Sequence, residues 1–282
     1  MTRPTLFDAA ARARAQTRAR RVGFADVLHR EGALEVQERL ALVNKTFTAP
    51  AIVGAAADVW AEVLGIEARQ VAEAEVLGLE AEAQDLVISG LHLHAENDPV
   101  GQLIQMRRAL RPDGLLLAAL FGGRSLRELR GVLTEAEAEL RGGVSPRVHP
   151  MAEIRDVGGL LQRAGFALPV ADTFALTLSY ESLLHLMRDL RAMGEVNTLF
   201  ARSRAPLRRD VLMRAAQLYA ERHSDADGRV TATVEMIVLT GWAPSDTQQK
   251  PLKPGSAKHS LAEALTAFEM PEGSPKSDHS AD

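Results

Sequence analysis

From about residue 49 onward, the chain alternates between short apolar runs and longer segments with helical spacing. Three runs are continuously apolar, as strands covered on both faces are: PAIVGAA, QDLVISGL and GLLLAALF. Between the last two, Asp98 and Pro99 fit the start of a helix with Leu103 and Leu110 on its apolar face, and a Pro-Asp-Gly turn ends it. The pattern predicts βα units and a largely parallel sheet.

The second half of the chain predicts more helices and a pair of long strands. Ser125 and Glu128 fit a capping box at the start of a helix, which the Gly142-Gly143 pair ends. A further helix is expected at about 152–164. The alternating runs VADTFALTLSY and RVTATVEMIVLTGW are long enough to pair, with two helices between them. We therefore predict an α/β fold whose sheet is parallel in its middle and ends in an antiparallel pair.

Three parts are expected along the chain: a basic helical arm at 1–45, the α/β domain at 46–243, and a disordered tail at 244–282. The arm is rich in arginine. It is either a solvated helix that packs its few apolar residues on the domain, or a docking arm for an acidic partner or a membrane surface. The tail is rich in Pro, Ser, Lys and Gly, which is typical of disorder.

Composition narrows the function classes. The 282 residues include no cysteine, so disulfides, thiolate zinc sites and a thiol nucleophile are excluded, and any metal would rely on His, Asp and Glu. The net charge of -4 argues against a surface built for nucleic acid. With no secretory pattern and no apolar run of about 18 residues, we expect no transmembrane segment and a cytoplasmic location.

The stretch DLVISGLHLHAENDP ends an apolar run in two histidines, His92 and His94. On an extended backbone the two would point to the same side. His94 and Glu96 form a His-x-Glu pair, and with a distant His149 or His185 they could supply the two histidines and one carboxylate of an oxygen-activating iron site. Alternatively, the loop lines a pocket and the histidines face substrate, or it is a solvated loop. Since no third ligand can be placed, no metal ligand is assigned.

Longer motifs carry a resemblance. The stretch LHLHAENDPVGQLIQMRRALRPDGLLLAALFGG resembles the fourth strand, crossover helix and fifth strand of class I S-adenosylmethionine (SAM)-dependent methyltransferases. SLRELRGVLTEAEAELRGGVSPRVHPMAEIRDVGGLLQRAGF, DLRAMGEVN and the arm LFDAAARARAQTRARR resemble one branch, the respiratory complex I assembly factors first described as methyltransferases and later associated with arginine hydroxylation. The resemblance implies a Rossmann-like sheet of seven strands, with SAM across the carboxyl ends of the early strands.

The region expected to hold SAM departs from that family. Its turn after the first strand reads VGAAADVW instead of a glycine-rich turn, and Glu73 and Glu75 are the only candidates for the acidic residue expected about 20 positions further on. The resemblance implies these cofactor-binding residues: Gly54, Ala55, Glu73, Ser89 and Leu91. The chain from Gly54 to Asp85 fits only about one βαβ unit, where the family has two further strands with their helices. We predict that one βα unit is missing and that the SAM site is eroded.

Three functions are compatible with this sequence. The first is a SAM-dependent methyltransferase that acts on a protein, for which no catalytic residue is assigned because the enzyme mainly orients the acceptor. The second is a non-catalytic binding or assembly factor on the same scaffold, and the third is a metal-assisted protein hydroxylase. The partner is a protein substrate or a respiratory assembly partner, with peripheral membrane contact through the arm as a further option. The expected substrate-facing residues are His92, His94, Gly122 and Gly123.

Overall fold

The computed structural model describes residues 5–248 of the chain. The chain divides into a unit Met1–Asp246 and a second unit, Thr247–Asp282. The arginine-rich segment 1–45 therefore lies in the same unit as the α/β domain. Residues 249–282, most of the tail for which we predict disorder, lie outside the described residues.

The sheet is mixed, as predicted, and its strand order is β2-β1-β3-β4-β6-β5. The strands are β1 (Pro50–Val53), β2 (Arg69–Val71), β3 (Gln84–Gly90), β4 (Leu110–Phe121), β5 (Ala167–Tyr180) and β6 (Val230–Trp242). The pairs β1–β2, β1–β3 and β3–β4 are parallel, while β4–β6 and β5–β6 are antiparallel. Within residues 5–248 the sheet has six strands, where the resemblance implies seven.

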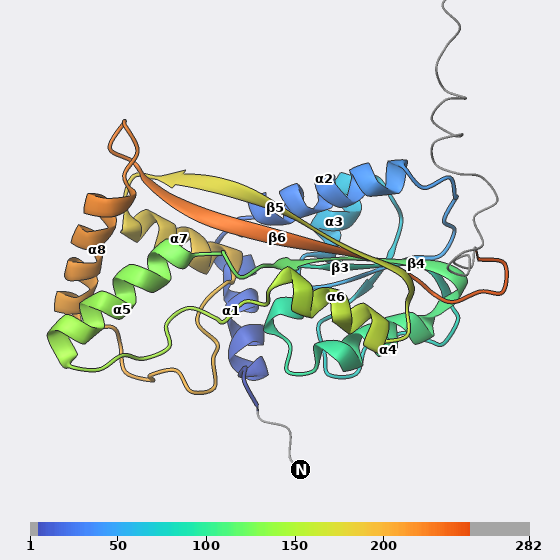
Figure 1. Cartoon of the computed structure of the whole chain (residues 1–282), viewed down its shortest axis with the longest axis horizontal. Helices are drawn as coiled ribbons and strands as arrows, with labels where there is room; N and C mark the ends of the chain where they lie inside the picture. Colours follow the sequence, from blue (N-terminus) through green and yellow to red (C-terminus); the bar gives the residue numbers. More distant parts are fainter. Residues whose placement is uncertain (1–4, 249–282) are drawn as a thin grey trace, which may run out of the picture. The chain divides into compact units, whose positions relative to one another are not determined.

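Helices cover both faces of this sheet (Figure 1). They are α1 (Ala9–Val22), α2 (Val27–Ala41), α3 (Ala57–Leu64), α4 (Pro99–Ala109), α5 (Arg127–Arg141), α6 (Ile154–Arg163), α7 (Leu183–Met193) and α8 (Arg209–His223). Alternate residues of β4 face opposite ways: Leu115 and Leu117 pack with α2 and α3, whereas Leu116 and Leu120 pack with α4 and α6. The continuous apolar run in β4 is explained by this double cover.

The antiparallel pair β5–β6 extends beyond the parallel part of the sheet toward α5, α7 and α8 (Figure 1). A third apolar cluster joins those three helices to the first residues of β6, Val230 and Ala232. The chain therefore adds a helical layer at the carboxyl end of β4.

The chain between Gly54 and Asp85 contains α3 and β2 only. Residues 72–83, all of them described, form neither helix nor strand and lead directly from β2 into β3. A family member would place a further strand and helix here. This edge of the sheet therefore has one βα layer fewer than the resemblance implies.

The start of α4 is as predicted, but the start of α5 is not. The Asp98 carboxylate accepts from the Gly101 N–H at 2.8 Å, with Pro99 at the first helical position. The expected capping box is wrong, because the Ser125 hydroxyl donates to the Glu235 carbonyl and the Glu128 carboxylate accepts from Thr233 of β6. Both side chains tie α5 to the sheet instead of capping the helix.

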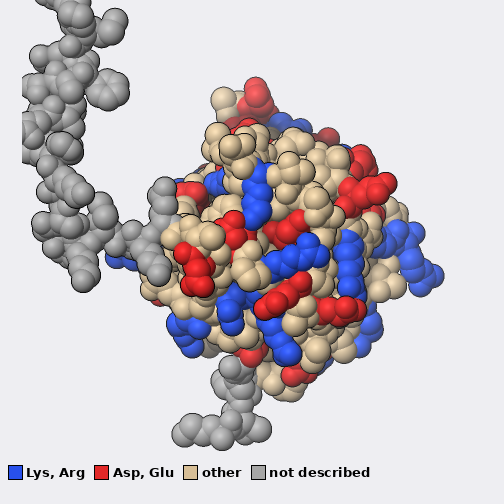
Figure 2. Space-filling model, turned by 90° about the vertical axis from the view of Figure 1, so that its right-hand side faces the viewer, with Lys and Arg blue, Asp and Glu red and all other residues tan. Residues whose placement is uncertain are grey.

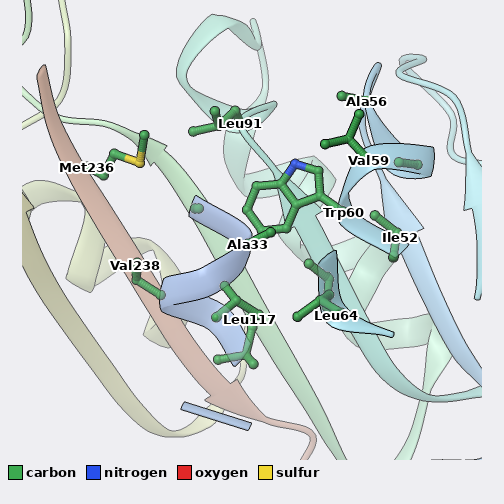
Figure 3. Close-up of a cluster of buried hydrophobic side chains, with 14 of the residues drawn as sticks. Ala33, Ile52, Ala56, Val59, Trp60, Leu64, Leu91, Leu117, Met236 and Val238 are labelled. Atoms are coloured by element: carbon green, nitrogen blue, oxygen red, sulfur yellow. The ribbon is translucent and has the colours of Figure 1, made fainter. Parts of the chain in front are cut away.

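Trp60 of α3 fills the centre of the core between the sheet and α2 (Figure 3). Its side chain is fully buried, and its indole N–H donates to Nδ1 of His29 at 3.0 Å. Burial lowers the pKa of His29 to about 4, so that histidine is neutral and accepts this bond. A Cβ added at Gly32 or Gly90 would lie 3.0 or 2.6 Å from the indole, so both glycines make room for the ring.

One face of the surface carries acidic and basic side chains side by side (Figure 2). The two signs of charge are interspersed on this face. Among residues 5–248, no helix combines the length and apolarity that a membrane span requires.

Replacing Trp60 by Ala should lower the free energy of unfolding by about 3–5 kcal/mol, because a large cavity would form against α2 and β3. Urea unfolding followed by circular dichroism measures this change. Leu34 of α2, which is 45% exposed, provides the control, and Leu34→Ala should change the free energy by about 0.5 kcal/mol or less. Equal losses in the two variants would contradict the central role given to Trp60.

Candidate functional site

The predicted cofactor residues come together at the carboxyl ends of β1, β2 and β3. Gly54 follows β1 with φ +145°, and a Cβ added there would lie 2.7 Å from the Gly90 carbonyl oxygen. The Ala55 N–H donates to the carboxylate of Glu73, which lies just beyond β2. Leu91 follows β3 with a left-handed φ of +52°. Ser89 is fully buried, and its hydroxyl makes no hydrogen bond within the described residues.

An arginine from α1 occupies the centre of this arrangement. Arg12 is 5% exposed, and its Nε donates to Glu73 at 2.9 Å. Its Nη1 donates to Glu195 at 3.4 Å, and its Nη2 donates to the Leu91 carbonyl at 3.3 Å. We call Glu73, Glu195 and the Leu91 carbonyl the guanidinium cage. Gln16, one turn further along α1, donates to Glu73 at 2.8 Å.

The cage keeps its members ionised despite their burial. Burial alone would raise the pKa of Glu195, but Arg12 and His94 outweigh it and lower that pKa to about 2. Burial acts on Glu73 in the same direction, and Arg12 again outweighs it, so the pKa of Glu73 lies well below its ordinary value. Burial would lower the pKa of Arg12, but Glu195 and Glu73 raise it. The guanidinium and both carboxylates are therefore charged at neutral pH.

The two histidines do not lie on an extended backbone, so the prediction that they share one side is wrong. Leu93–Ala95 form a 3₁₀ turn, η1, and His92 has φ -112° and ψ -48°. His92 is fully buried and faces Gln102, Glu73 and Glu96. His94 packs on Phe121 with 4.7 Å between ring centroids, and its Nε2 lies 3.3 Å from Glu195. The solvated-loop alternative is excluded by this burial.

Of the distant histidines, neither joins His92. The Nε2 of His149 accepts from the Thr198 N–H at 2.9 Å, and burial lowers the pKa of His149 to about 4. His185 bonds to Ser182 at the start of α7. Among the described residues, the predicted iron site of two histidines and Glu96, completed by His149 or His185, is therefore not assembled.

Gly122 and Gly123 lie after β4, where carboxylates crowd their backbone. A Cβ at Gly122 would lie 2.6 Å from the Glu235 carboxylate, and one at Gly123 would lie 2.3 Å from that of Glu153. The Gly122 N–H donates to the Glu235 carbonyl. The glycines make room for these two side chains, and a role toward substrate stays a prediction.

A cavity of about 370 Å³ lies between β4, α5 and α7, lined mostly by apolar residues and also by Arg147, Arg191 and Arg202. Its lining includes Phe121, Leu129, Met151, Leu190 and, as an acidic group, Glu195. Glu195 therefore belongs to both places: its carboxylate contacts Arg12 and His94, and the residue also lines the cavity.

The residues present do not fit SAM as they are arranged here. The expected ribose ligand, Glu73, already accepts from Arg12, Gln16 and Ala55. The Leu91 carbonyl accepts from Arg12 as well. A ribose would have to displace Arg12 from a buried ion pair, and the βα layer that would enclose the adenine is not built.

Sequence reasoning missed Arg12, Gln16 and Glu195. All three lie inside motifs that carry the family resemblance, LFDAAARARAQTRARR and DLRAMGEVN. The motifs therefore contained the signal that could have identified these three residues as candidates. Their pairing could not be seen, because Arg12 and Glu195 are 183 residues apart in the chain.

The low pKa of Glu195 gives the site a pH signature. A carboxylate with a lowered pKa contributes stability above its unfolded value of about 4.5, and that stability is lost as pH falls toward the folded value of about 2. Between pH 5.5 and 3, wild-type protein should lose about 2 kcal/mol more unfolding free energy than Glu195→Gln. Urea unfolding at several pH values measures the difference.

The control for this comparison is Glu38→Gln, on the exposed side of α2. Its stability curve should run parallel to the wild-type curve over the same pH range. If the Glu195→Gln curve also ran parallel to wild type, the Arg12–Glu195 pair would not be the source of the acid sensitivity.

Comparison with known proteins supports the resemblance. Residues 8–118 match the model of a methyltransferase domain family. Over 192 residues the chain is 41% identical to "Arginine-hydroxylase NDUFAF5, mitochondrial" of Dictyostelium discoideum, covering 68% of this chain and 44% of that protein. It is 35% identical to a malonyl-[acyl-carrier protein] O-methyltransferase of Laribacter hongkongensis, covering 65% and 59%.

Among solved structures, the YcgJ protein of Bacillus aligns with a TM-score of 0.48 and 9% identity, covering 76% of this chain and 99% of that one. The aligned part spans between 44% and 60% of the NDUFAF5 relatives. The expected resemblance is confirmed: the chain carries a class I methyltransferase-type domain related to the NDUFAF5 arginine hydroxylases.

Proposed function

We propose that this chain acts on a protein partner by binding an arginine side chain of that partner, and that it does not use SAM as a methyl donor. The guanidinium cage around Arg12 is the observation that carries this proposal. The partner that the family resemblance favours is a respiratory enzyme subunit during assembly.

The cage has the donor–acceptor pattern that arginine recognition requires. A guanidinium offers N–H donors in a planar fork, and carboxylates on two sides with a carbonyl on a third satisfy them. Arg12 makes these contacts through Nε, Nη1 and Nη2. An arginine from a partner would find the same acceptors once the Arg12 side chain left the cage.

A cavity lies beside one member of the cage, Glu195. The cavity between β4, α5 and α7 includes Glu195 in its lining, and the apolar part of that lining suits the methylene stem of a long side chain. The relatives named arginine-hydroxylase support arginine as the chemical class. Since the chain aligns with only part of those proteins, their activity is carried over here as part of the proposal.

A second candidate, SAM-dependent methyl transfer, is favoured by one observation. Gly54 adopts φ +145° with its backbone against Gly90, a close approach that a side chain would prevent. Such a glycine after the first strand is what a nucleotide-like cofactor needs. Under this candidate, α1 would have to move and carry Arg12 and Gln16 away from Glu73.

Isothermal titration with SAM and S-adenosylhomocysteine separates the two candidates. We expect no binding tighter than a dissociation constant of about 1 mM, for wild type and for Arg12→Ala. Micromolar binding to wild type would establish the second candidate. Binding to Arg12→Ala alone would show an intact donor site closed by α1, and would also contradict the proposal that SAM is not used.

The cage itself is tested by chemical rescue of Arg12→Ala. Loss of Arg12 leaves two buried carboxylates without their cation and should cost about 3–5 kcal/mol of stability. Acetyl-arginine amide should raise the melting temperature of this variant, because its guanidinium can refill the cage. Acetyl-lysine amide has the same charge but lacks the planar fork, so its effect should be much smaller.

The control is Arg20→Ala, which removes an exposed pair with Asp58 from the same helix. Its melting temperature should not respond to acetyl-arginine amide. Equal effects of the arginine and lysine compounds on Arg12→Ala, or no effect of either, would overturn the assignment of a guanidinium site.

A further inference from the structure

A second group of side chains adjoins the guanidinium cage. Glu73, His92 and Glu96, which we call the His92 cluster, each present one atom within 4.8 Å of the others. The Nδ1 of His92 lies 3.3 Å from a Glu96 oxygen and 3.9 Å from a Glu73 oxygen. Ligand atoms at about 2.0–2.2 Å from one metal ion are roughly 3.0–3.6 Å apart, so small side-chain movements would close the set around an ion.

Gln102 fixes which nitrogen of His92 faces the carboxylates. The Gln102 amide N–H₂ donates to the carbonyls of Ala74 and Glu75, at 2.8 and 3.1 Å. Its amide oxygen therefore faces Nε2 of His92, at 3.3 Å, and can only accept. Nε2 must carry a proton for this contact to be a hydrogen bond. In the neutral ring, Nδ1 is then an unprotonated lone pair.

Within residues 5–248 that lone pair has no hydrogen-bond partner, although His92 is fully buried. It faces two carboxylate oxygens, which are acceptors as well. Acceptors that face one another in a buried site repel, unless a proton or a cation lies between them. An outer-shell partner that holds one ring nitrogen and aims the other is how metal-binding histidines are usually oriented.

The charges around the cluster point the same way. Glu73, Glu96 and Glu195 contribute three carboxylates, and Arg12 is the permanent cation that contacts Glu73 and Glu195. Arg12 can balance one negative charge fully. Burial raises the pKa of Glu96, so this carboxyl takes up a proton more readily than a free one, and a divalent cation would take the place of that proton.

From this geometry we propose that Glu73, His92 and Glu96 bind a divalent first-row transition metal ion. One imidazole nitrogen and two carboxylate oxygens suit Mn²⁺, Fe²⁺, Co²⁺ or Zn²⁺. The Glu96 side chain is 18% exposed, which gives an ion access from solvent and leaves room for water ligands. Arg12 Nε donates to Oε2 of Glu73 at 2.9 Å, while Oε1, the oxygen that faces His92, accepts from the Ala55 N–H and from Arg12 Nη2, and these contacts orient the ligand. This proposal does not depend on arginine binding.

Co²⁺ is the probe, because its visible absorption reports nitrogen and oxygen ligands directly. Full-length protein freed of metal with a chelator is titrated with Co²⁺. We expect one ion per chain with a visible band. Glu96→Gln, which keeps the shape of the side chain, should weaken binding at least tenfold, and His92→Gln should weaken it and change the band.

The control is His185→Gln, since His185 lies at the surface beside Glu181 and outside the cluster. Co²⁺ affinity of this variant should equal that of wild type. Melting temperatures without metal show whether each variant folds. If His92→Gln does not fold, the Co²⁺ affinity of Glu96→Gln decides the test. Absence of a one-to-one complex with wild type, or wild-type affinity in Glu96→Gln, would overturn the proposal.

Discussion

The burial of one guanidinium determines how the carboxyl edge of this sheet is organised. Arg12 reaches from the first helix to Glu73 beyond β2 and to Glu195 beyond α7. Removing an ion from water costs several kcal/mol, and the cost is recovered only with excellent geometry. Here Nε, Nη1 and Nη2 all find acceptors. Three segments far apart in the chain are thereby fixed around one cation.

The missing βα layer explains why an arginine can lie there. In a complete class I sheet, the chain after β2 would build a further strand and helix, whereas residues 72–83 pass directly to β3. The shortened connection leaves Glu73 facing α1, and Arg12 and Gln16 satisfy its carboxylate. The acidic residue is retained, but its partners belong to the protein itself. Retention of this residue is therefore poor evidence for SAM binding.

Local and periodic signals predicted most of the fold, and long-range pairing accounts for most of what they missed. The apolar run of β4 and the Asp98–Pro99 helix start were readable, because burial on two faces and N-capping each leave a local pattern. The prediction of a Ser125–Glu128 capping box was wrong, because both side chains form hydrogen bonds with residues of β6 and not with the backbone at the start of α5. The family resemblance identified Gly54 and Glu73 as site residues. No spacing rule pairs Arg12 with Glu73 and Glu195, which lie 61 and 183 positions away in the chain.

Glu73 belongs to both the guanidinium cage and the His92 cluster, so the two proposed sites are linked. Oε2 accepts from Arg12 Nε, while Oε1 accepts from Arg12 Nη2 and the Ala55 N–H and faces Nδ1 of His92. A cation bound at the His92 cluster would draw electron density from the Glu73 carboxylate and repel a guanidinium in the cage, which weakens arginine binding. The cation would also engage the negative charge of Glu96, which otherwise competes with the cage for a guanidinium. Whatever the net sign, linkage requires the effect to be reciprocal: the factor by which a metal ion changes arginine affinity equals the factor by which arginine changes metal affinity. A carboxylate shared by two cations thus couples the arm to the sheet edge through charge alone, without a change of fold.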